Sequence, residues 1–269
     1  MRERLAADPR VTVEPAPLAL VEEICRAHDR DYVTAFLEGT IDPAAMRRIG
    51  FPWSEALVKR TLASAGGTLA AARVAMESGC SGNLAGGTDH AFRDYGSGFC
   101  VFNDLAIAIL ALRANGLAER AAVVDLDVHQ GDGTAHMFGG DDRVLTLSMH
   151  GRNNFPFRKQ QSRIDVELPD GTGDEEYLRE LASVLPRVFD WRPDVIFYQS
   201  GVDGLATDRL GRLALTLSGV MERDRQVFES SRVAGIPIVI TMGGGYSEPI
   251  ECTAEAHANT YLQALKYIA

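Results

Sequence analysis

The chain has 269 residues, of which 46% are hydrophobic and 24% are charged, so its composition is that of a globular protein and excludes disordered and collagen-like chains. The formal net charge of −10 gives no basic surplus for nucleic acid, no apolar run is long enough to cross a membrane, and the N-terminus lacks the apolar core of a signal peptide. We therefore expect one domain over residues 1–269 without nucleic-acid or membrane partners, and four cysteines that form no CxxC pair favour a reducing cytoplasm.

The first part of the chain predicts helices and loops. Residues 11–14 form a short β-prone run. Apolar side chains recur at helical spacing in two segments, residues 18–27 and 53–78. The second is interrupted by Gly66-Gly67. Residues 80–100 are rich in Gly and Ser and predict a long loop, a type of segment that often carries function. Asn103 is placed to cap a helix over residues 104–115.

The rest of the chain alternates between strands and helices. Continuous apolar runs predict four strands, at residues 121–126, 143–149, 195–198 and 236–241. Helical spacing predicts two helices between them, near residues 174–189 and 216–233. This alternation is typical of an α/β fold, in which a mostly parallel sheet has helices on both faces. Ligands of such sheets bind beyond the carboxyl ends of the strands, so we look for chemistry there.

Acidic and imidazole side chains follow two of these strands. Asp125, Asp127 and His129 have the i, i+2, i+4 spacing that places side chains on one side of a strand. This spacing fits a metal site and a polar strand end with capping aspartates equally well. Asp203 follows the third predicted strand, and beside the first cluster it becomes a candidate third ligand.

Two glycine-rich segments add candidate groups. Tyr246 directly follows three glycines after the fourth strand, where the backbone can approach a ligand and the phenol can donate a hydrogen bond. By itself this segment fits an ordinary flexible turn as well. His90 lies in the loop over residues 80–100, and together with the Asp-x-Asp-x-His cluster it is a candidate general base.

Seven motifs occur in this order along the chain: GGTDHAF, DYGSGFCVFND, VDLDVHQGDGTAHMF, LTLSMH, ELPDGTGDEEYL, QSGVD and GGGYS. Together they give the chain a resemblance to the zinc-dependent histone deacetylase family, in its small bacterial, class IV-like form. The similarity extends from about residue 17 to about residue 250. It implies an arginase-like α/β fold and hydrolysis of an acylated amine, most often acyl-lysine. The oligomeric state and the acyl length stay open.

The resemblance also implies roles for individual residues. Asp127, His129 and Asp203 would hold one catalytic Zn²⁺, or Fe²⁺ in the cell, with a position open for water. His90 would act as general base and then acid. The remaining implied roles are orientation of His90 by Asp132, stabilisation of the oxyanion by Tyr246, a substrate tunnel at Gly98, Phe99, Phe155 and Gly244, and a structural K⁺ at Asp125 and Ser148.

The chain departs from the family pattern at two places. Asp89 replaces the first of two adjacent histidines, and the family partner of that histidine is matched by Asp125. We expect Asp89 to reduce activity, either as one of two carboxylates sharing a proton or by altering His90; if it turns to solvent or to a loop amide, it matters little. The family's additional N-terminal strand and rim loop have no counterpart before MRERLAADP, which truncation, a misplaced start codon or real loss would explain.

Three functions fit these observations. The first is a zinc-dependent deacylase. The second is an acyl-lysine or small-ligand binding protein that keeps the metal but is catalytically weak because of Asp89. The third is a manganese ureohydrolase, which shares the fold but needs further ligands for a second metal that the sequence does not display.

Overall fold

A computed structural model describes residues 1–268. In this part of the chain, six strands form one sheet in the order β1-β6-β5-β2-β3-β4, and every neighbouring pair is parallel. The strands are β1 (Cys80–Gly82), β2 (Ala121–Asp125), β3 (Val144–Gly151), β4 (Ile164–Leu168), β5 (Val195–Gln199) and β6 (Ile238–Thr241). The α/β fold class expected from the sequence is therefore confirmed.

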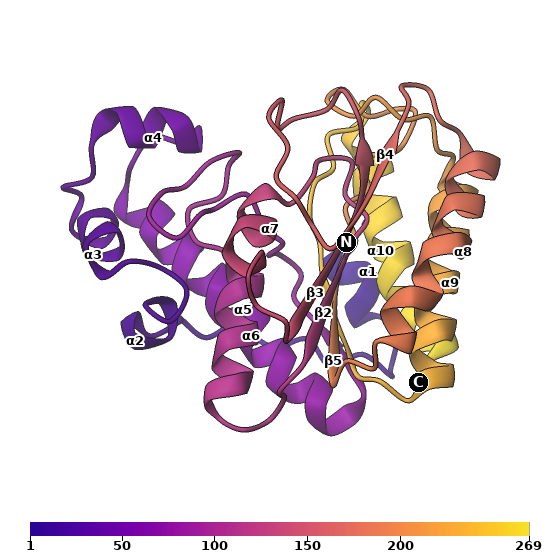
Figure 1. The fold of residues 1–269 in the computed structure, drawn as a ribbon, viewed down its shortest axis with the longest axis horizontal. Coiled ribbons are helices and arrows are strands. Elements are labelled where there is room, and N and C mark those ends of the chain that lie inside the picture. Colours follow the sequence, from indigo (N-terminus) through magenta and orange to yellow (C-terminus); the bar gives the residue numbers. More distant parts are fainter. Residues whose placement is uncertain (269) are drawn as a thin grey trace.

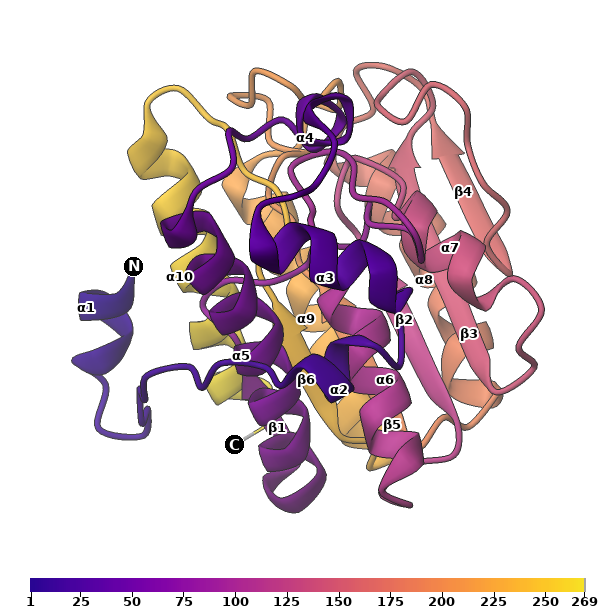
Figure 2. The ribbon, with the colours of Figure 1, turned by 90° about the vertical axis from the view of Figure 1, so that its left-hand side faces the viewer.

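Helices cover both faces of this sheet (Figure 1). One face carries α5 (Glu55–Ser78) and α6 (Asp104–Ala114), and the other carries α8 (Asp174–Asp190), α9 (Leu217–Ala234) and α10 (Ile250–Tyr267). The remaining helices are α1 (Arg2–Ala6), α2 (Val21–Ile24), α3 (Arg30–Glu38), α4 (Pro43–Ile49) and α7 (Asp132–Phe138). Helix α1 lies beside α10, and α4 stands over the α5 side near the end of the sheet that carries the site (Figure 2).

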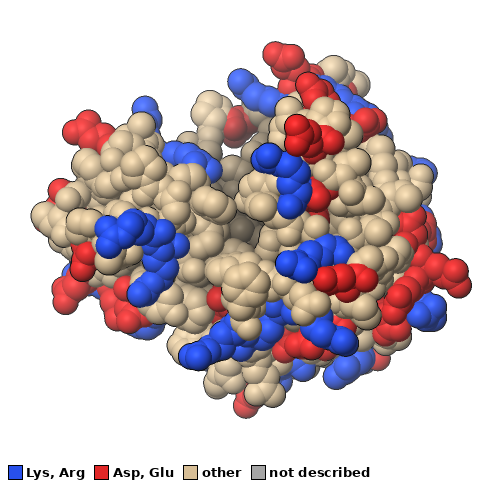
Figure 3. Space-filling model, turned by 90° about the horizontal axis from the view of Figure 1, so that it is seen from above, with Lys and Arg blue, Asp and Glu red and all other residues tan. Residues whose placement is uncertain are grey.

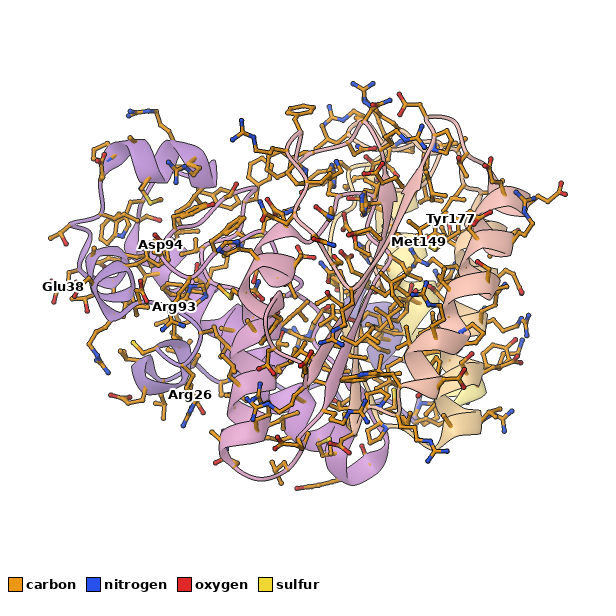
Figure 4. The ribbon with its side chains drawn as sticks, in the orientation of Figure 1. Arg26, Glu38, Arg93, Asp94, Met149 and Tyr177 are labelled. Carbon is orange, nitrogen blue, oxygen red and sulfur yellow. The ribbon has the colours of Figure 1, made fainter. Side chains whose placement is uncertain are left out.

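Alternation along the strands divides the core into two layers. Val123 and Phe197 pack with the helices of the α5 and α6 face, whereas Tyr198 packs with those of the α8–α10 face. Met149 on β3 and Tyr177 on α8 are fully buried in this second layer (Figure 4). Strands buried on both faces explain why the sequence shows continuous apolar runs.

Some expected elements differ from those observed. Residues 11–14 are not a strand, and the helix expected over 18–27 is reduced to α2. Helix α5 runs through the two glycines that were read as an interruption. A Cβ on Gly66 would overlap the carbonyl of Pro17, and one on Gly67 would lie 2.9 Å from the amide of Asn83, so these glycines admit close neighbours. The sequence analysis also missed the edge strands β1 and β4.

In residues 1–268, no helix combines the length and apolar character that a membrane span requires.

Candidate active site

The candidate side chains gather at the edge formed by the carboxyl ends of the strands. Figure 3 looks down on this edge and shows a hollow near its centre, with Lys and Arg side chains beside it. Strand β2 leads to Asp127 and His129, β5 leads to Asp203, and the segment after β6 carries Tyr246. The loop between β1 and α6 brings His90. Segments far apart in the sequence thus meet where ligands bind in parallel sheets.

Asp127, His129 and Asp203 converge, and one ligand atom of each lies within 4.8 Å of the other two. The Nδ1 atom of His129 is 3.1 Å from Asp127 Oδ1 and 3.0 Å from Asp203 Oδ2. Ligand atoms about 2.1 Å from a tetrahedral zinc ion lie roughly 3.4 Å apart, so the two separations from Nδ1 are a few tenths of an ångström shorter than in such a site and a small outward shift would admit the ion. Three protein ligands would leave its fourth position open.

The charges in this cluster favour a bound cation. Burial lowers the pKa of His129, but hydrogen bonds to the two carboxylates and their charges outweigh burial and raise the pKa to about 11. Burial and the charge of Asp127 raise the pKa of Asp203 to about 7. Burial also raises the pKa of Asp127, but the hydrogen bond and charge of His129 hold it below its usual range. The two carboxylates thus favour positive charge at this place, which suits a divalent cation.

Backbone amides donate hydrogen bonds to the carboxylates of Asp127 and Asp203. Asp127 Oδ2 accepts a hydrogen bond from the amide of Gly244 (2.6 Å), and Asp203 Oδ1 accepts one from the amide of Val128 (2.9 Å). Contacts of this kind orient metal ligands. A Cβ on Gly201 would overlap Asp127 Oδ2, and one on Gly244 would overlap Asp203 Oδ2. The structure therefore places Gly244 against the candidate ligands, while its contact with substrate stays a prediction.

His90 pairs with Asp132, the first residue of α7. The Nδ1 atom of His90 lies 2.8 Å from Asp132 Oδ1. If Nδ1–H donates to this carboxylate, Nε2 is left as the basic nitrogen. The ring centroid of His90 is 6.2 Å from that of His129, and its side chain is 11% exposed. A reachable imidazole oriented by a carboxylate next to the cluster has the arrangement of a general base.

The loop that carries His90 is fixed by the N-terminus of α6. Asn103 caps this helix as expected, because its side-chain oxygen accepts a hydrogen bond from the amide of Ala106 (2.9 Å). Its Nδ2 atom also points toward the carbonyls of Asp89 (3.3 Å) and Ala91 (3.2 Å), on either side of His90. The cap residue therefore holds the backbone that positions the candidate base.

Asp89 does not turn to solvent, since only 3% of it is exposed. It accepts a hydrogen bond from Gln199 Nε2 (3.3 Å). A Cβ on Gly131 would lie 2.6 Å from Asp89 Oδ2 and 3.0 Å from Asp125 Oδ2, so both carboxylates face the same glycine. Burial raises the pKa of Asp89, and the charges of Asp125 and Asp127 raise it further. The interpretation in which Asp89 points outward is wrong.

Asp125 on β2 and Ser148 on β3 are paired in the sheet, and their side chains are in contact. The hydroxyl of Ser148 donates to Asp125 Oδ2 (3.1 Å), which also accepts from the amide of Gly131 (3.0 Å). Burial raises the pKa of Asp125, and the charge of Asp127 adds to this shift. A buried carboxylate beside a hydroxyl suits a monovalent cation, although K⁺ binding stays a prediction.

Tyr246 stands half-buried next to the cluster. Its backbone amide donates to Asp208 Oδ2 (2.6 Å), which anchors the segment after the three glycines. Burial raises the pKa of the phenol, and the charges of Asp127 and Asp203 raise it further. The hydroxyl therefore stays protonated at neutral pH and can donate a hydrogen bond.

Of the two expected tunnel aromatics, Phe155 lies against His90 and Phe99 lies against Phe51. A Cβ on Gly98 would lie 2.8 Å from His90 Cδ2 and 3.0 Å from Phe155 Cε1, so this glycine leaves room for both rings. The ring centroid of Phe155 is 5.1 Å from that of His90. Phe99 is 48% exposed, and its ring centroid is 5.3 Å from that of Phe51. A tunnel with Phe99 and Phe155 as opposite walls stays a prediction.

The sequence analysis missed three polar side chains that support the site. Gln199, the last residue of β5, contacts Asp89, and the rule about strand ends could have found it. Lys159 donates to the carbonyls on both sides of Phe155, at Asn154 (2.6 Å) and Pro156 (2.7 Å). Arg223 lies inside α9. A single charged residue in a loop or a helix carries no signal of such contacts.

Comparisons with known proteins show the family to which the chain is similar. The family model described as histone deacetylase domain matches residues 1–263. An uncharacterized protein of Picosynechococcus sp. is 49% identical over 232 residues, which cover 86% of this chain and 77% of that protein. Histone deacetylase 2 of Arabidopsis thaliana is 37% identical over 185 residues, 67% of this chain and 48% of its own length. A probable deacetylase of Archaeoglobus fulgidus is 32% identical over 258 residues, 88% of this chain and 69% of its own length.

Proposed function

The chain belongs to the histone deacetylase family, and we propose that it is a metal-dependent hydrolase that removes an acyl group from acyl-lysine or from another acylated amine. The observation that carries this proposal is the convergence of Asp127, His129 and Asp203 beside the pair of His90 and Asp132. A set of candidate metal ligands and an oriented base at one edge of the sheet are the groups that metal-dependent amide hydrolysis uses.

We assign the catalytic ion to Asp127, His129 and Asp203, as zinc or, in the cell, Fe²⁺. Bound there, the ion supplies a Lewis acid and makes water more acidic. We assign a structural K⁺ to Asp125 and Ser148, whose contact at the end of the strands supports such a site. Four cysteines without disulfide bonds support a cytoplasmic location.

His90 moves the protons in this proposal. Its Nε2 atom accepts a proton from the water that attacks the acyl carbonyl and later gives it to the departing amine. Asp132 fixes the tautomer through Nδ1 and stabilises the imidazolium that forms between these two events. The roles of base and acid thus need one imidazole and one carboxylate. The distance of 2.8 Å between His90 Nδ1 and Asp132 Oδ1 supports this assignment.

Tyr246 donates its hydroxyl proton toward the oxygen of the acyl carbonyl as negative charge develops there. The raised pKa of the phenol supports this role because a donor must stay protonated. Phe155, which lies against His90, and Phe99 line the path of the substrate, and Gly98 leaves space between the rings.

A second function is favoured by the burial of Asp89. The Asp89 carboxyl, which accepts from Gln199 and faces Gly131 together with Asp125, stands in the sequence motif where the family has a histidine, so this position supplies no imidazole. This would leave a protein that binds metal and an acylated ligand but turns over slowly or not at all.

One experiment separates these functions. The metal content of the protein is measured as purified, the protein is then loaded with zinc, and hydrolysis and binding of acetyl-lysine peptides are followed. Hydrolysis that stops when the metal is removed supports the deacylase. Peptide binding without hydrolysis supports the binding protein, and two manganese ions per chain would instead indicate a ureohydrolase.

A further inference from the structure

Helix α9 buries a complete ion pair directly behind the candidate metal site. Arg223 is 1% exposed and Asp224 is 0% exposed. The guanidinium donates to Asp224 Oδ1 from Nε (2.9 Å) and from one terminal nitrogen, Nη2 (2.7 Å). Asp224 also accepts hydrogen bonds from Tyr198 on β5 (2.5 Å) and Thr260 on α10 (2.7 Å). The pair is therefore well satisfied, as buried charges must be.

The other donors of Arg223 reach backbone carbonyls. Its Nη1 atom lies 2.6 Å from the oxygen of Gly201 and 3.4 Å from that of Leu126. Its Nη2 atom lies 3.3 Å from the oxygen of Ser200. Each of these carbonyls follows the last paired residues of β2 and β5, where the ladder between the two strands ends. The guanidinium thus bonds to the segment after β2 and to the segment after β5, at the point where both leave the sheet.

These two segments carry the candidate ligands. Leu126 directly precedes Asp127, and Gly201 lies two residues before Asp203. The spacing of the two carboxylates therefore depends on the spacing of the carbonyls that Arg223 holds.

We propose that Arg223 is a positioning residue of the metal site, which sets the separation of Asp127 and Asp203 through the carbonyls of Leu126 and Gly201. This inference rests on the proposed function in one respect, namely that Asp127 and Asp203 hold the ion. The hydrogen bonds of the Arg223 side chain go to Asp224 and to backbone carbonyls and to none of the three candidate ligand side chains, so its proposed action is through the backbone.

Stability alone does not account for this pair. Buried ion pairs can often be replaced by apolar side chains of similar volume without loss of stability. What a guanidinium adds is a rigid planar fork that bonds a carboxylate and several carbonyls in fixed directions. Lysine carries the same charge on one ammonium group, which cannot bond to Asp224 and to the segments after β2 and β5 in the same geometry.

The test compares Arg223→Lys, and Arg223→Met combined with Asp224→Asn, with the control Val227→Ala. The double variant removes both charges, so no unpaired buried charge is left to prevent folding. Val227 is a fully buried residue of the same helix and makes none of these hydrogen bonds. Thermal unfolding of the metal-free proteins measures the structural cost of each change. Zinc affinity, measured by competition with a chelator, and the visible absorption of bound Co²⁺ report the ligand geometry.

We expect both Arg223 variants to bind zinc about 10–100-fold more weakly, as is typical when a group that orients a metal ligand is lost. Their Co²⁺ absorption should also change, whereas Val227→Ala should keep the zinc affinity and Co²⁺ spectrum of the wild type. Arg223 variants that bind zinc as tightly as the control, with an unchanged Co²⁺ spectrum, would overturn the inference. A wild type that binds neither Zn²⁺ nor Co²⁺ would overturn the proposed function together with it, which distinguishes the two failures.

Discussion

Replacing Asp89 by histidine tests the departure of this chain from its family. The residue is 3% exposed and faces Gly131 together with Asp125, so its side chain lies inside the site. An imidazole there could donate to Asp125, in the way that His90 meets Asp132. The substitution also removes a carboxylate from a region that already holds Asp125, Asp127 and Asp132, whose charges all raise the pKa of Asp89.

We expect Asp89→His to increase kcat on an acetyl-lysine peptide at least tenfold. General acid and base groups contribute about 10²–10⁴-fold, but the larger imidazole must fit beside Gly131 and Gln199, so the minimum gain that we expect lies below this range. A tenfold gain corresponds to about 1.4 kcal/mol in the activation barrier. The assay measures kcat and KM over a range of pH, with zinc content determined for each preparation.

Asp89→Asn is the matched control, because it keeps the shape of the side chain and removes its charge. An equal gain in both variants would assign the defect to the negative charge and not to the missing imidazole. An Asp89→His enzyme that is no faster at any pH, with zinc still bound, would refute the reasoning. Asp89 would then be suited to a substrate other than acetyl-lysine.

Three further predictions concern the groups around the candidate ion. Asp203→Ala should lose most of the bound zinc and all hydrolysis, and full zinc occupancy by elemental analysis would remove Asp203 from the ligand set. Tyr246→Phe should lower kcat by about 10²–10³ with zinc content unchanged, since it deletes one oxyanion donor; steady-state kinetics with unaltered turnover would show that the phenol has no part. Gly201→Ala should weaken zinc binding because its Cβ would overlap Asp127 Oδ2, whereas Gly140→Ala, which meets no neighbour within 4 Å, should bind like the wild type; equal zinc affinities would contradict the steric argument.

The sequence predicted the central strands well because they are buried on both faces. Strands β2, β3, β5 and β6 appear as continuous apolar runs, and a rule about strand ends then locates the candidate ligands. The edge strands were missed for physical reasons. β1 is Cys-Ser-Gly, and β4 alternates buried and exposed residues with Asp165 and Glu167, so neither forms an apolar run.

Side-chain partnerships were harder to predict than strands. The pairing of His90 with Asp132 was expected only through the family resemblance, since 42 positions separate the two residues. The placement of Asp89 toward Asp125 was one of several open alternatives until the burial of both residues was known. Sequence spacing fixes which side of a strand a residue takes, but it does not fix which residue of another loop it meets.

The proposed role of Arg223 links contacts of this kind to the geometry of the candidate metal site. The two candidate ligand carboxylates belong to neighbouring strands that separate after the pair Asp125 and Gln199, so the ladder no longer sets their distance. Beyond that point the distance between the two carboxylates depends on groups that bridge the segments after β2 and β5. The guanidinium of Arg223 is one group that bonds to both segments. If Asp127 and Asp203 hold the ion, we therefore expect metal affinity at this edge of the sheet to depend on α9, a helix that contributes no candidate ligand.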